Sequence, residues 1–351
     1  MAPRVVLFGA TGYTGRLTAK ALVARGERPV LAGRDARALA VLAAELGGLP
    51  TALAHAGDPA SVRALVEAGD VLVTTVGPFG RYGAVALEAA AGKGAIYLDA
   101  AGESPFTRQV FETYGPRGGT LLSGFGYDAV AGNLAAGLAL EGIGEDAARV
   151  DVAYFVGGGS LWPAASAGTL GSLVPVLSAP RYTYRKGIVP ELRPRVRDFA
   201  VGARMRPALT AGGVEHYTLP RLAPGLQEVD RYVGMLGPAT RAAAALPRPL
   251  VAWAGGIALN LLAKQARRRP RQPTLTARVV AIVYDAVGTP LGEVHLSGVD
   301  PYDFTARFLA WSAVRALEGV YGTGALGPVE AFGLEALQAG CAEAGIVRVS
   351  G

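Results

Sequence analysis

A glycine-rich loop near the N-terminus constrains the fold of this chain more than any other stretch of its sequence. The apolar run 5–8 predicts a buried strand, three glycines follow at intervals of three residues, and a helix over 17–24 and a strand over 29–32 are predicted next. In such a unit the glycines permit a tight turn, the approach of a pyrophosphate and close packing of the helix, whose N-terminal N–H groups attract phosphate. This setting favours a dinucleotide site over a purely structural glycine turn. The predicted contacts are Gly9, Ala10, Thr11, Gly12, Tyr13, Thr14 and Gly15.

Composition excludes several other classes of protein. The length of 351 residues indicates two domains, and a net charge of +6 favours anionic ligands without indicating a nucleic-acid partner. The single Cys341 excludes an intrachain disulfide and a cysteine-based metal site, and three scattered histidines do not suggest zinc, so no metal is expected. The N-terminus lacks the pattern of a signal peptide, so a cytoplasmic location is expected.

Strands and helices alternate through the first part of the chain. Strands are predicted over 51–56, 71–76, 95–98 and 120–122, and helices over 35–46, 61–68, 82–91, 106–114 and 130–140. Repeated βα units with short connections predict an α/β fold with a doubly wound parallel sheet. Ligands of such sheets bind at the carboxyl ends of the strands, where Asp58 and Gly102 are expected to contribute to the cofactor site.

The pattern changes after about residue 149. Strands over 150–156, 275–285 and 293–297, the last two joined by a hairpin-like turn, predict a second α+β domain on a mixed or antiparallel sheet. No secondary structure is predicted for the Pro- and Arg-rich region 180–224. Helices over 302–317 and 328–344 and a strand over 346–349 complete the chain. The predicted domains are 1–128, which binds the dinucleotide, 129–325, which binds substrate, and 326–351, a C-terminal segment.

The end of the second strand indicates which dinucleotide binds. An NAD enzyme usually carries an acidic residue there to hold the ribose 2′-hydroxyl, whereas this strand ends in Gly33 and Arg34. A guanidinium at this point offers a charge-assisted contact to a 2′-phosphate, and Arg37 lies one helical turn further on. NADP is therefore the predicted cofactor, the alternative being that Arg34 is an ordinary surface arginine. Asp35 is expected to cap the following helix.

Several motifs along the chain are similar to those of the saccharopine-dehydrogenase-like oxidoreductases and, within them, the trans-acting enoyl reductases. The first motifs are Gly9 to Gly15, Leu31 to Arg34 and, most specific, Thr74 to Gly83, which reads TTVGPFGRYG. Later motifs are Tyr97 to Glu103, Gly126 to Val130, Asp300 to Ala306 and Gly327 to Gly333. The resemblance implies an N-terminal Rossmann domain, an inserted α/β domain and a C-terminal helix that returns to the first domain. Where the family usually reads Gly-Phe-Asp-Ser-Ile-Pro-Ser-Asp, this chain reads Gly-Tyr-Asp-Ala-Val-Ala-Gly-Asn over 126–133, so the substrate-facing segment departs from the family pattern.

Hydride transfer requires a positioned nicotinamide and a group that protonates or polarises the acceptor. The loop after the fourth strand is expected to line the cofactor with Val76, Gly77, Pro78 and Phe79. The candidate proton donors are Tyr82, Tyr127 and Asp128, because a phenol or a carboxyl near the ring can serve. For each of them a structural hydrogen bond is the alternative.

Two other motifs are weighed against simpler explanations. Tyr182 and Lys186 have the Tyr-x-x-x-Lys spacing of short-chain dehydrogenases, but a helix is not expected between Pro180 and Gly187, so the pair is not predicted to be catalytic. The apolar stretch 250–263 is followed by the basic cluster 264–271. It is short for a membrane span, which takes about 20 residues, and fits either an interfacial helix or a buried helix with a solvated charged end.

The sequence therefore predicts an NADPH-dependent reductase. The resemblance implies that its substrate is an enoyl-type C=C bond in specialised lipid or polyketide metabolism. Imine reduction, or the reverse oxidation of a secondary amine, is the enzymatic alternative; it predicts an arginine-lined cleft, for which Arg181, Arg185 and Arg193 are candidates. A non-catalytic NADP-binding sensor or scaffold is the alternative of another class. A lipid-like or carrier-bound substrate, peripheral membrane contact through 250–271 and a homodimer are left open as partners.

Overall fold

The computed structural model describes residues 2–157, 181–234, 237–245 and 275–350. Contacts among the residues group the chain into two units. Unit 1 comprises residues 1–102, 106–127 and 302–344, and unit 2 comprises 103–105, 128–301 and 345–351. The chain passes from unit 1 to unit 2 after residue 127 and returns to unit 1 at residue 302, while the predicted domains end at residues 128 and 325.

Unit 1 is built on a parallel seven-stranded sheet, as the alternating pattern predicted. Its strands, in spatial order, are β15 (Gly324–Ala325), β6 (Thr120–Leu122), β5 (Ile96–Asp99), β4 (Val71–Thr74), β1 (Val5–Phe8), β2 (Val30–Gly33) and β3 (Thr51–Leu53). The strands β1 and β4 are buried along their whole length, which explains why they consist of continuous apolar runs. The order runs outward from β1 in one direction and from β4 in the other, which is the arrangement of a doubly wound Rossmann sheet.

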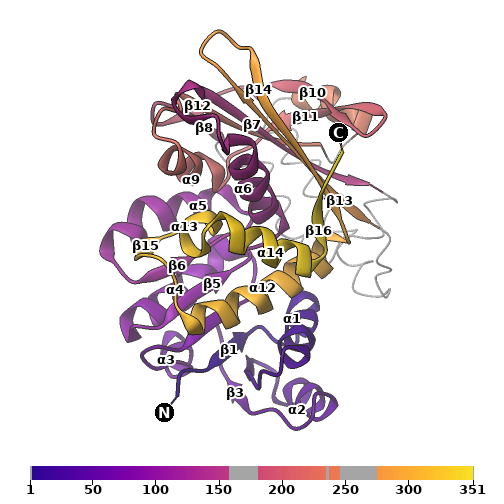
Figure 1. The fold of residues 1–351 in the computed structure, drawn as a ribbon. Helices are drawn as coiled ribbons and strands as arrows, with labels where there is room; N and C mark the ends of the chain where they lie inside the picture. Colours follow the sequence, from indigo (N-terminus) through magenta and orange to yellow (C-terminus); the bar gives the residue numbers. More distant parts are fainter. Residues whose placement is uncertain (1, 158–180, 235–236, 246–274, 351) are drawn as a thin grey trace. The chain divides into compact units, whose positions relative to one another are not determined.

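The helices of unit 1 include three from the end of the chain. Figure 1 shows α12 and α14, coloured orange to yellow, beside the indigo and purple elements of residues 1–127. The helices are α1 (Tyr13–Ala24), α2 (Ala36–Glu45), α3 (Pro59–Arg63), α4 (Phe79–Lys93), α5 (Ser104–Gln109) with a π-helical turn (Val110–Tyr114), α12 (Pro301–Glu318), α13 (Pro328–Phe332) and α14 (Leu334–Ala344). The predicted helix 328–344 is divided because Gly333 has φ +79°, which a right-handed helix does not allow.

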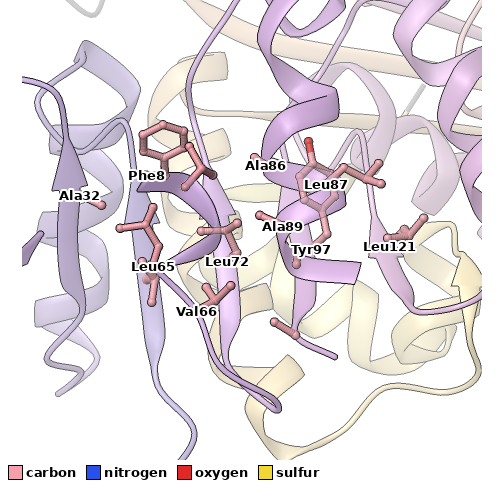
Figure 2. Packing of buried hydrophobic residues seen from close by; sticks show 14 of the residues in the cluster. Phe8, Ala32, Leu65, Val66, Leu72, Ala86, Leu87, Ala89, Tyr97 and Leu121 are labelled. Atoms are coloured by element: carbon pink, nitrogen blue, oxygen red, sulfur yellow. The ribbon is translucent and has the colours of Figure 1, made fainter. Parts of the chain in front are cut away.

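The core of unit 1 lies between the sheet and its helices. Figure 2 shows Leu87 of α4 beside Tyr97 of β5, with Phe8 and Leu72 of the adjacent strands β1 and β4 in the same cluster. Leu72, Leu87 and Tyr97 are completely buried, so this cluster removes large apolar side chains from water.

Helix α4 begins at Phe79, three residues before the predicted start, with Pro78 as its N-cap. Gly83, which lies inside both the predicted and the observed helix, faces the ring of Phe106 in α5. A Cβ on Gly83 would lie 2.4 Å from Cζ of Phe106, so the close approach of the two helices requires a glycine.

Unit 2 is built on a mixed nine-stranded sheet, as predicted. Its strands are β7 (Arg149–Gly157), β8 (Arg181–Arg185), β9 (Ile188–Glu191), β10 (Val196–Val201), β11 (Arg204–Thr210), β12 (Glu228–Val233), β13 (Thr276–Tyr284), β14 (Pro290–Gly298) and β16 (Ile346–Val349). The central β7 is parallel to β12 and antiparallel to β13. The region 180–224, for which no structure was predicted, contains β8 to β11 and helix α9 (Glu215–Leu222).

Helix α6 (Tyr127–Leu140) packs closely on the central strand of this sheet. A Cβ on Gly132 would lie 1.8 Å from the hydroxyl of Tyr154 and 2.8 Å from Cγ1 of Val152. Both are residues of β7, so Gly132 allows the helix to approach the strand. Where the family pattern has Pro-Ser, this chain has Ala131 and Gly132, and Gly132 is the residue that packs against β7.

Substitution of Gly83 by alanine tests the contact between α4 and α5. We expect Gly83→Ala to lower the free energy of unfolding by about 1–3 kcal/mol, because the added methyl group overlaps the Phe106 ring. Gly92→Ala, in the same helix but with no heavy atom within 4 Å of its added Cβ, is the matched control. It is expected to be neutral or to stabilise by up to roughly 1 kcal/mol. Urea denaturation of both variants measures the difference, and equal effects would contradict the packing explanation.

Candidate functional site

The strand order of unit 1 reverses between β1 and β4. These two strands are hydrogen-bonded neighbours, yet the chain continues from β1 to β2 on one side and from β4 to β5 on the other. Loops that leave the carboxyl ends of two such strands diverge and form the usual ligand-binding crevice of a doubly wound sheet. Here these loops are the glycine-rich loop and the segment 75–78.

The glycine-rich loop is held by close contacts that leave no room for a side chain at Gly9 or Gly15. Gly9 has φ +90°, and its N–H donates to the carbonyl of Ala32 at 2.9 Å. A Cβ at Gly9 would lie 2.7 Å from Oγ1 of Thr75, and a Cβ at Gly15 would lie 2.2 Å from the carbonyl oxygen of Gly9. The predicted tight turn and close helix packing are therefore both present.

The N-terminus of α1 is exposed and has no side-chain cap. The helix begins at Tyr13, its N-cap Gly12 has no side chain, and none of the described first-turn residues is acidic. Gly12 and Tyr13 are exposed, Thr11 and Thr14 are partly exposed, and Ala10 is buried. The N-terminal N–H groups and the positive end of the helix dipole thus lie at an accessible loop, which is the arrangement that binds phosphate.

The second loop is tied to the first. The Thr75 hydroxyl donates to the Gly9 carbonyl at 3.1 Å, and a cis peptide bond joins Gly77 to Pro78. Val76 and Phe79 pack partly against the hydrophobic core, and the Phe79 ring lies 6.0 Å from that of Phe106. Gly77 is the exposed residue of this loop.

The end of β2 lies beside the glycine-rich loop. A Cβ on Gly33 would be 3.9 Å from Oγ1 of Thr11, while Arg34 and Arg37 are exposed. Asp35 accepts a hydrogen bond from the N–H of Ala38 at 3.0 Å, so its predicted role as a helix cap is confirmed.

Two other predicted cofactor residues lie at the same edge of the sheet in different settings. Asp58 caps α3 and accepts hydrogen bonds from the N–H groups of Ala60 and Ser61 at 3.2 and 3.4 Å. Its carboxylate is thus engaged in the structure. Gly102 is exposed in the loop after β5.

A buried carboxyl group joins the loops after β5 and β6. Asp99 is completely buried and accepts hydrogen bonds from the N–H groups of Ala101 and Gly124, both at 2.8 Å, and from the Ser123 hydroxyl at 2.9 Å. Burial raises the pKa of this carboxyl, and the three donors oppose that effect. Asp99 was not predicted as a site residue, although a carboxylate at the end of an apolar strand is a recognisable signal.

The first turn of α12 completes this edge of unit 1. The Thr305 hydroxyl accepts a hydrogen bond from the N–H of Tyr127 at 3.1 Å, and the Tyr302 ring meets the Tyr13 ring edge to face at 5.5 Å. The motif 300–306 was identified in the sequence. Its position beside the glycine-rich loop could not be predicted, because Tyr13 and Tyr302 are far apart along the chain.

The three candidate proton donors have different surroundings. Tyr82 is partly buried, and the Arg81 guanidinium lies 5.0 Å from its ring. Tyr127 is 5% exposed, and its ring lies 6.4 Å from that of Phe304. The side chain of Asp128 is 35% exposed, and its Oδ2 lies 3.7 Å from Nη2 of Arg231.

Asp128 belongs to a group of four titratable side chains in unit 2, here called the Arg231 cluster: Asp128, Tyr154, Glu215 and Arg231. Arg231 donates to the main-chain carbonyls of Asp128 at 2.9 Å and Gly212 at 3.1 Å, and its Nε lies 3.3 Å from Oε1 of Glu215. The Tyr154 hydroxyl donates to the same Glu215 oxygen. The cluster thus links α6, β7, α9 and β12. Apart from Asp128, its members were not predicted, because they come together from distant parts of the chain.

The arginines that an imine-type substrate would require are only partly available. Arg185 makes two hydrogen bonds to the buried carboxylate of Asp230, at 3.0 and 2.9 Å, and Arg195 binds the same carboxylate at 2.6 and 2.8 Å. Although burial opposes ionisation, these hydrogen bonds hold the pKa of Asp230 below its usual range. Arg185 is therefore used within the protein.

The remaining sequence motifs are the Tyr-x-x-x-Lys pair and the apolar and basic segments of 250–271. Tyr182 lies in strand β8, so the Tyr-x-x-x-Lys pair is not on a helix, as predicted. The segments 250–263 and 264–271 lie outside the described residues. Among the helices that the structure describes, none is long and apolar enough to cross a membrane. Within the same described residues, no group of three or more His, Cys, Asp or Glu side chains is placed to hold a metal ion.

His216, next to Glu215, provides a pH test of this region. Burial lowers the pKa of His216 to about 4, so the unfolded chain takes up a proton below about pH 6.5 that the native chain does not accept. Stability is therefore expected to fall by up to about 1.4 kcal/mol per pH unit between pH 6.5 and 4 on account of this residue. Urea denaturation across that range should show a shallower pH dependence in His216→Gln. His55→Gln, at an exposed position, is the control and should keep the wild-type slope.

Comparisons with known proteins agree with the motifs. No protein-family model matches the chain. Trans-acting enoyl reductases of Mycobacterium ulcerans and Mycobacterium bovis are 34% and 35% identical over 140 residues, which cover 37% of this chain and 34% of theirs. A Mycobacterium tuberculosis protein named after the same activity is 33% identical over 190 residues, 50% of this chain and 44% of that protein. Each match thus covers less than half of the relative's length.

Among solved structures, the apo form of a saccharopine dehydrogenase (L-glutamate-forming) from Saccharomyces cerevisiae is similar over the whole chain. The TM-score is 0.60 at 11% identity, with 99% of this chain and 100% of that chain covered. At this identity the likeness concerns the fold. The predicted resemblance is confirmed. The chain has the fold of a saccharopine dehydrogenase, and one half of its length is similar in sequence to trans-acting enoyl reductases.

Proposed function

We propose that this protein is an NADPH-dependent reductase of an enoyl-type C=C bond in specialised lipid or polyketide metabolism. The observation that carries the proposal is the pair of loops at the β1–β4 switch point, in which Gly9, Gly15 and Thr75 shape an open helix N-terminus. Such a crevice suits the pyrophosphate of a dinucleotide. The sequence similarity to trans-acting enoyl reductases supports the reaction type.

Arg34 supports NADPH rather than NADH. Its position directly after β2 is where the adenosine ribose lies in dinucleotide-binding folds, and its side chain is exposed. The acidic residue next to it, Asp35, is engaged as the N-cap of α2. Arg37, exposed in the first turn of α2, provides a second cation near the same point.

Asp128 is the proton donor that the surroundings favour. A nicotinamide cofactor supplies the hydride that adds to one carbon of the C=C bond, and a proton must reach the other carbon. Asp128 follows Tyr127, whose N–H is fixed at the carboxyl edge of the sheet of unit 1 by Thr305. It combines partial exposure with a raised pKa, which burial causes and Arg231 opposes, so its carboxyl keeps a proton to higher pH than an ordinary aspartate.

Substitution of Arg34 tests the cofactor. Arg34→Ala is expected to raise the dissociation constant for NADPH about tenfold to 100-fold, since a charge-assisted contact contributes about 1.5–3 kcal/mol, and to leave that for NADH nearly unchanged. Fluorescence titration of both cofactors measures this. Arg63→Ala, at an exposed position in α3, is the control and should affect neither. Equal weakening of both cofactors by Arg34→Ala would contradict the assignment.

Turnover tests the reaction. NADPH oxidation is expected with α,β-unsaturated thioesters, and Asp128→Asn should reduce kcat by about 100-fold to 10,000-fold while NADPH binding is kept. Turnover of imines alone would replace the proposal by C–N chemistry. Tight NADPH binding without turnover of a broad panel of thioesters and imines would indicate a sensor or scaffold.

A further inference from the structure

The Arg231 cluster contains more carboxyl groups than cations. Arg231 is always protonated, and it is the one cation among the four side chains, whereas Asp128 and Glu215 are both acids. With both acids ionised the cluster carries one uncompensated negative charge. Glu215 is completely buried and Arg231 is 6% exposed, so such a charge lies where water does not solvate it.

Among the described residues beside the cluster, none supplies a second cation. Tyr182 of β8 and His216 of α9 lie beside the cluster; the Tyr182 hydroxyl points to the carbonyls of Ser104 and Gly213, and burial keeps His216 neutral above about pH 4. The cluster is therefore electrically neutral when one of its two carboxyl groups holds a proton.

The hydrogen bonds identify how the two acids differ. Oε1 of Glu215 accepts a hydrogen bond from the Tyr154 hydroxyl and lies near Arg231. Oε2 of Glu215 is buried and has no hydrogen-bond partner among the described residues. Asp128 is the member through which the cluster meets solvent, since its side chain is 35% exposed.

We infer that Asp128 and Glu215, which both lie beside the single charge of Arg231, hold one proton between them, and that the buried Glu215 thereby sets the proton affinity of Asp128. Glu215 is a positioning residue in this scheme and does not touch the substrate. The pair titrates as a unit, because groups this close to one guanidinium each change the charge that the other experiences. The direction of the pKa shifts agrees, since burial raises both pKa values and Arg231 lowers both.

The use of the shared proton in catalysis rests on the proposed function. In a reduction, hydride addition forms one C–H bond, Asp128 gives its proton to the neighbouring carbon, and the pair recovers a proton from solvent through Asp128. The titration of the pair does not depend on that reaction and can be measured in the protein without cofactor.

Carbon-13 NMR of the full chain, with labelled Asp and Glu carboxyl carbons, tests the inference. The two signals are assigned by their loss in Asp128→Asn and Glu215→Gln. In the wild-type protein both are expected to move together through a step above the usual carboxyl range. In Glu215→Gln the Asp128 step should fall by at least about one pH unit, because the guanidinium then compensates Asp128 alone.

Tyr154→Phe should shift the shared step in the opposite direction, upward by about one pH unit, because the ionised form loses a donor. This variant also serves if Glu215→Gln does not fold. Glu228→Gln, in the same strand as Arg231 but paired with Arg185 at 3.5 Å, is the control and should leave the step in place. Separate titrations in the ordinary range, or shifts of the same sign in Glu215→Gln and Tyr154→Phe, would overturn the inference.

Enzyme assays separate this inference from the proposed function. If the NMR step behaves as described and no acceptor is reduced, the shared proton stands and the proposed reaction fails. If NADPH-dependent reduction occurs, the alkaline limb of kcat should follow the NMR step and move to lower pH in Glu215→Gln. If reduction occurs but the alkaline limb of kcat does not move in Glu215→Gln, the proposed function stands and the shared proton takes no part in the reaction.

Discussion

The close packing of α1 and of the segment after β4 against the backbone of the glycine-rich loop is the constraint on which unit 1 depends. Helix α1 meets the glycine-rich loop with no room for a Cβ at Gly15, and the loop meets Thr75 with no room for one at Gly9. A side chain at either position would separate the helix or the β4 loop from the end of β1. The same contacts bring the helix N-terminus to the edge of the sheet, so the packing and the predicted phosphate site have one cause.

Three buried carboxyl groups, one in unit 1 and two in unit 2, have different partners. Asp99 is held by two main-chain N–H groups and a hydroxyl, which fixes the loops after β5 and β6 without an opposite charge. Asp230 is matched by two arginines and is fully compensated. Glu215 shares its single arginine with Asp128, and this difference makes the Arg231 cluster a candidate for proton chemistry while the other two are structural.

Much of unit 1 could be predicted from local patterns. The glycine spacing, the apolar runs of β1 and β4 and the cap at Asp35 each act within a few residues, so the parallel sheet and the tight turn after β1 could be predicted from the sequence. The start of α4 was placed too late because Pro78 and Gly80 weaken the helical pattern, although proline is well suited to a helix start. Unit 2 was less predictable. Arg231 reaches Asp128 across 103 positions and Tyr154 reaches Glu215 across 61, and no local pattern encodes such pairs.

The return of the chain to unit 1 also has a consequence for its synthesis on the ribosome. Strand β15, the outer neighbour of β6, is made about 200 residues after β6. At 5–20 residues per second, roughly 10–40 s pass before β6 can be covered on that side. During this interval the nascent sheet presents β6 as an open edge, and the rings of Phe125 and Tyr127 lack the α12 residues that later cover them. Until α12 and β15 have been made, this part of the nascent chain exposes an unpaired strand edge and aromatic rings to solvent.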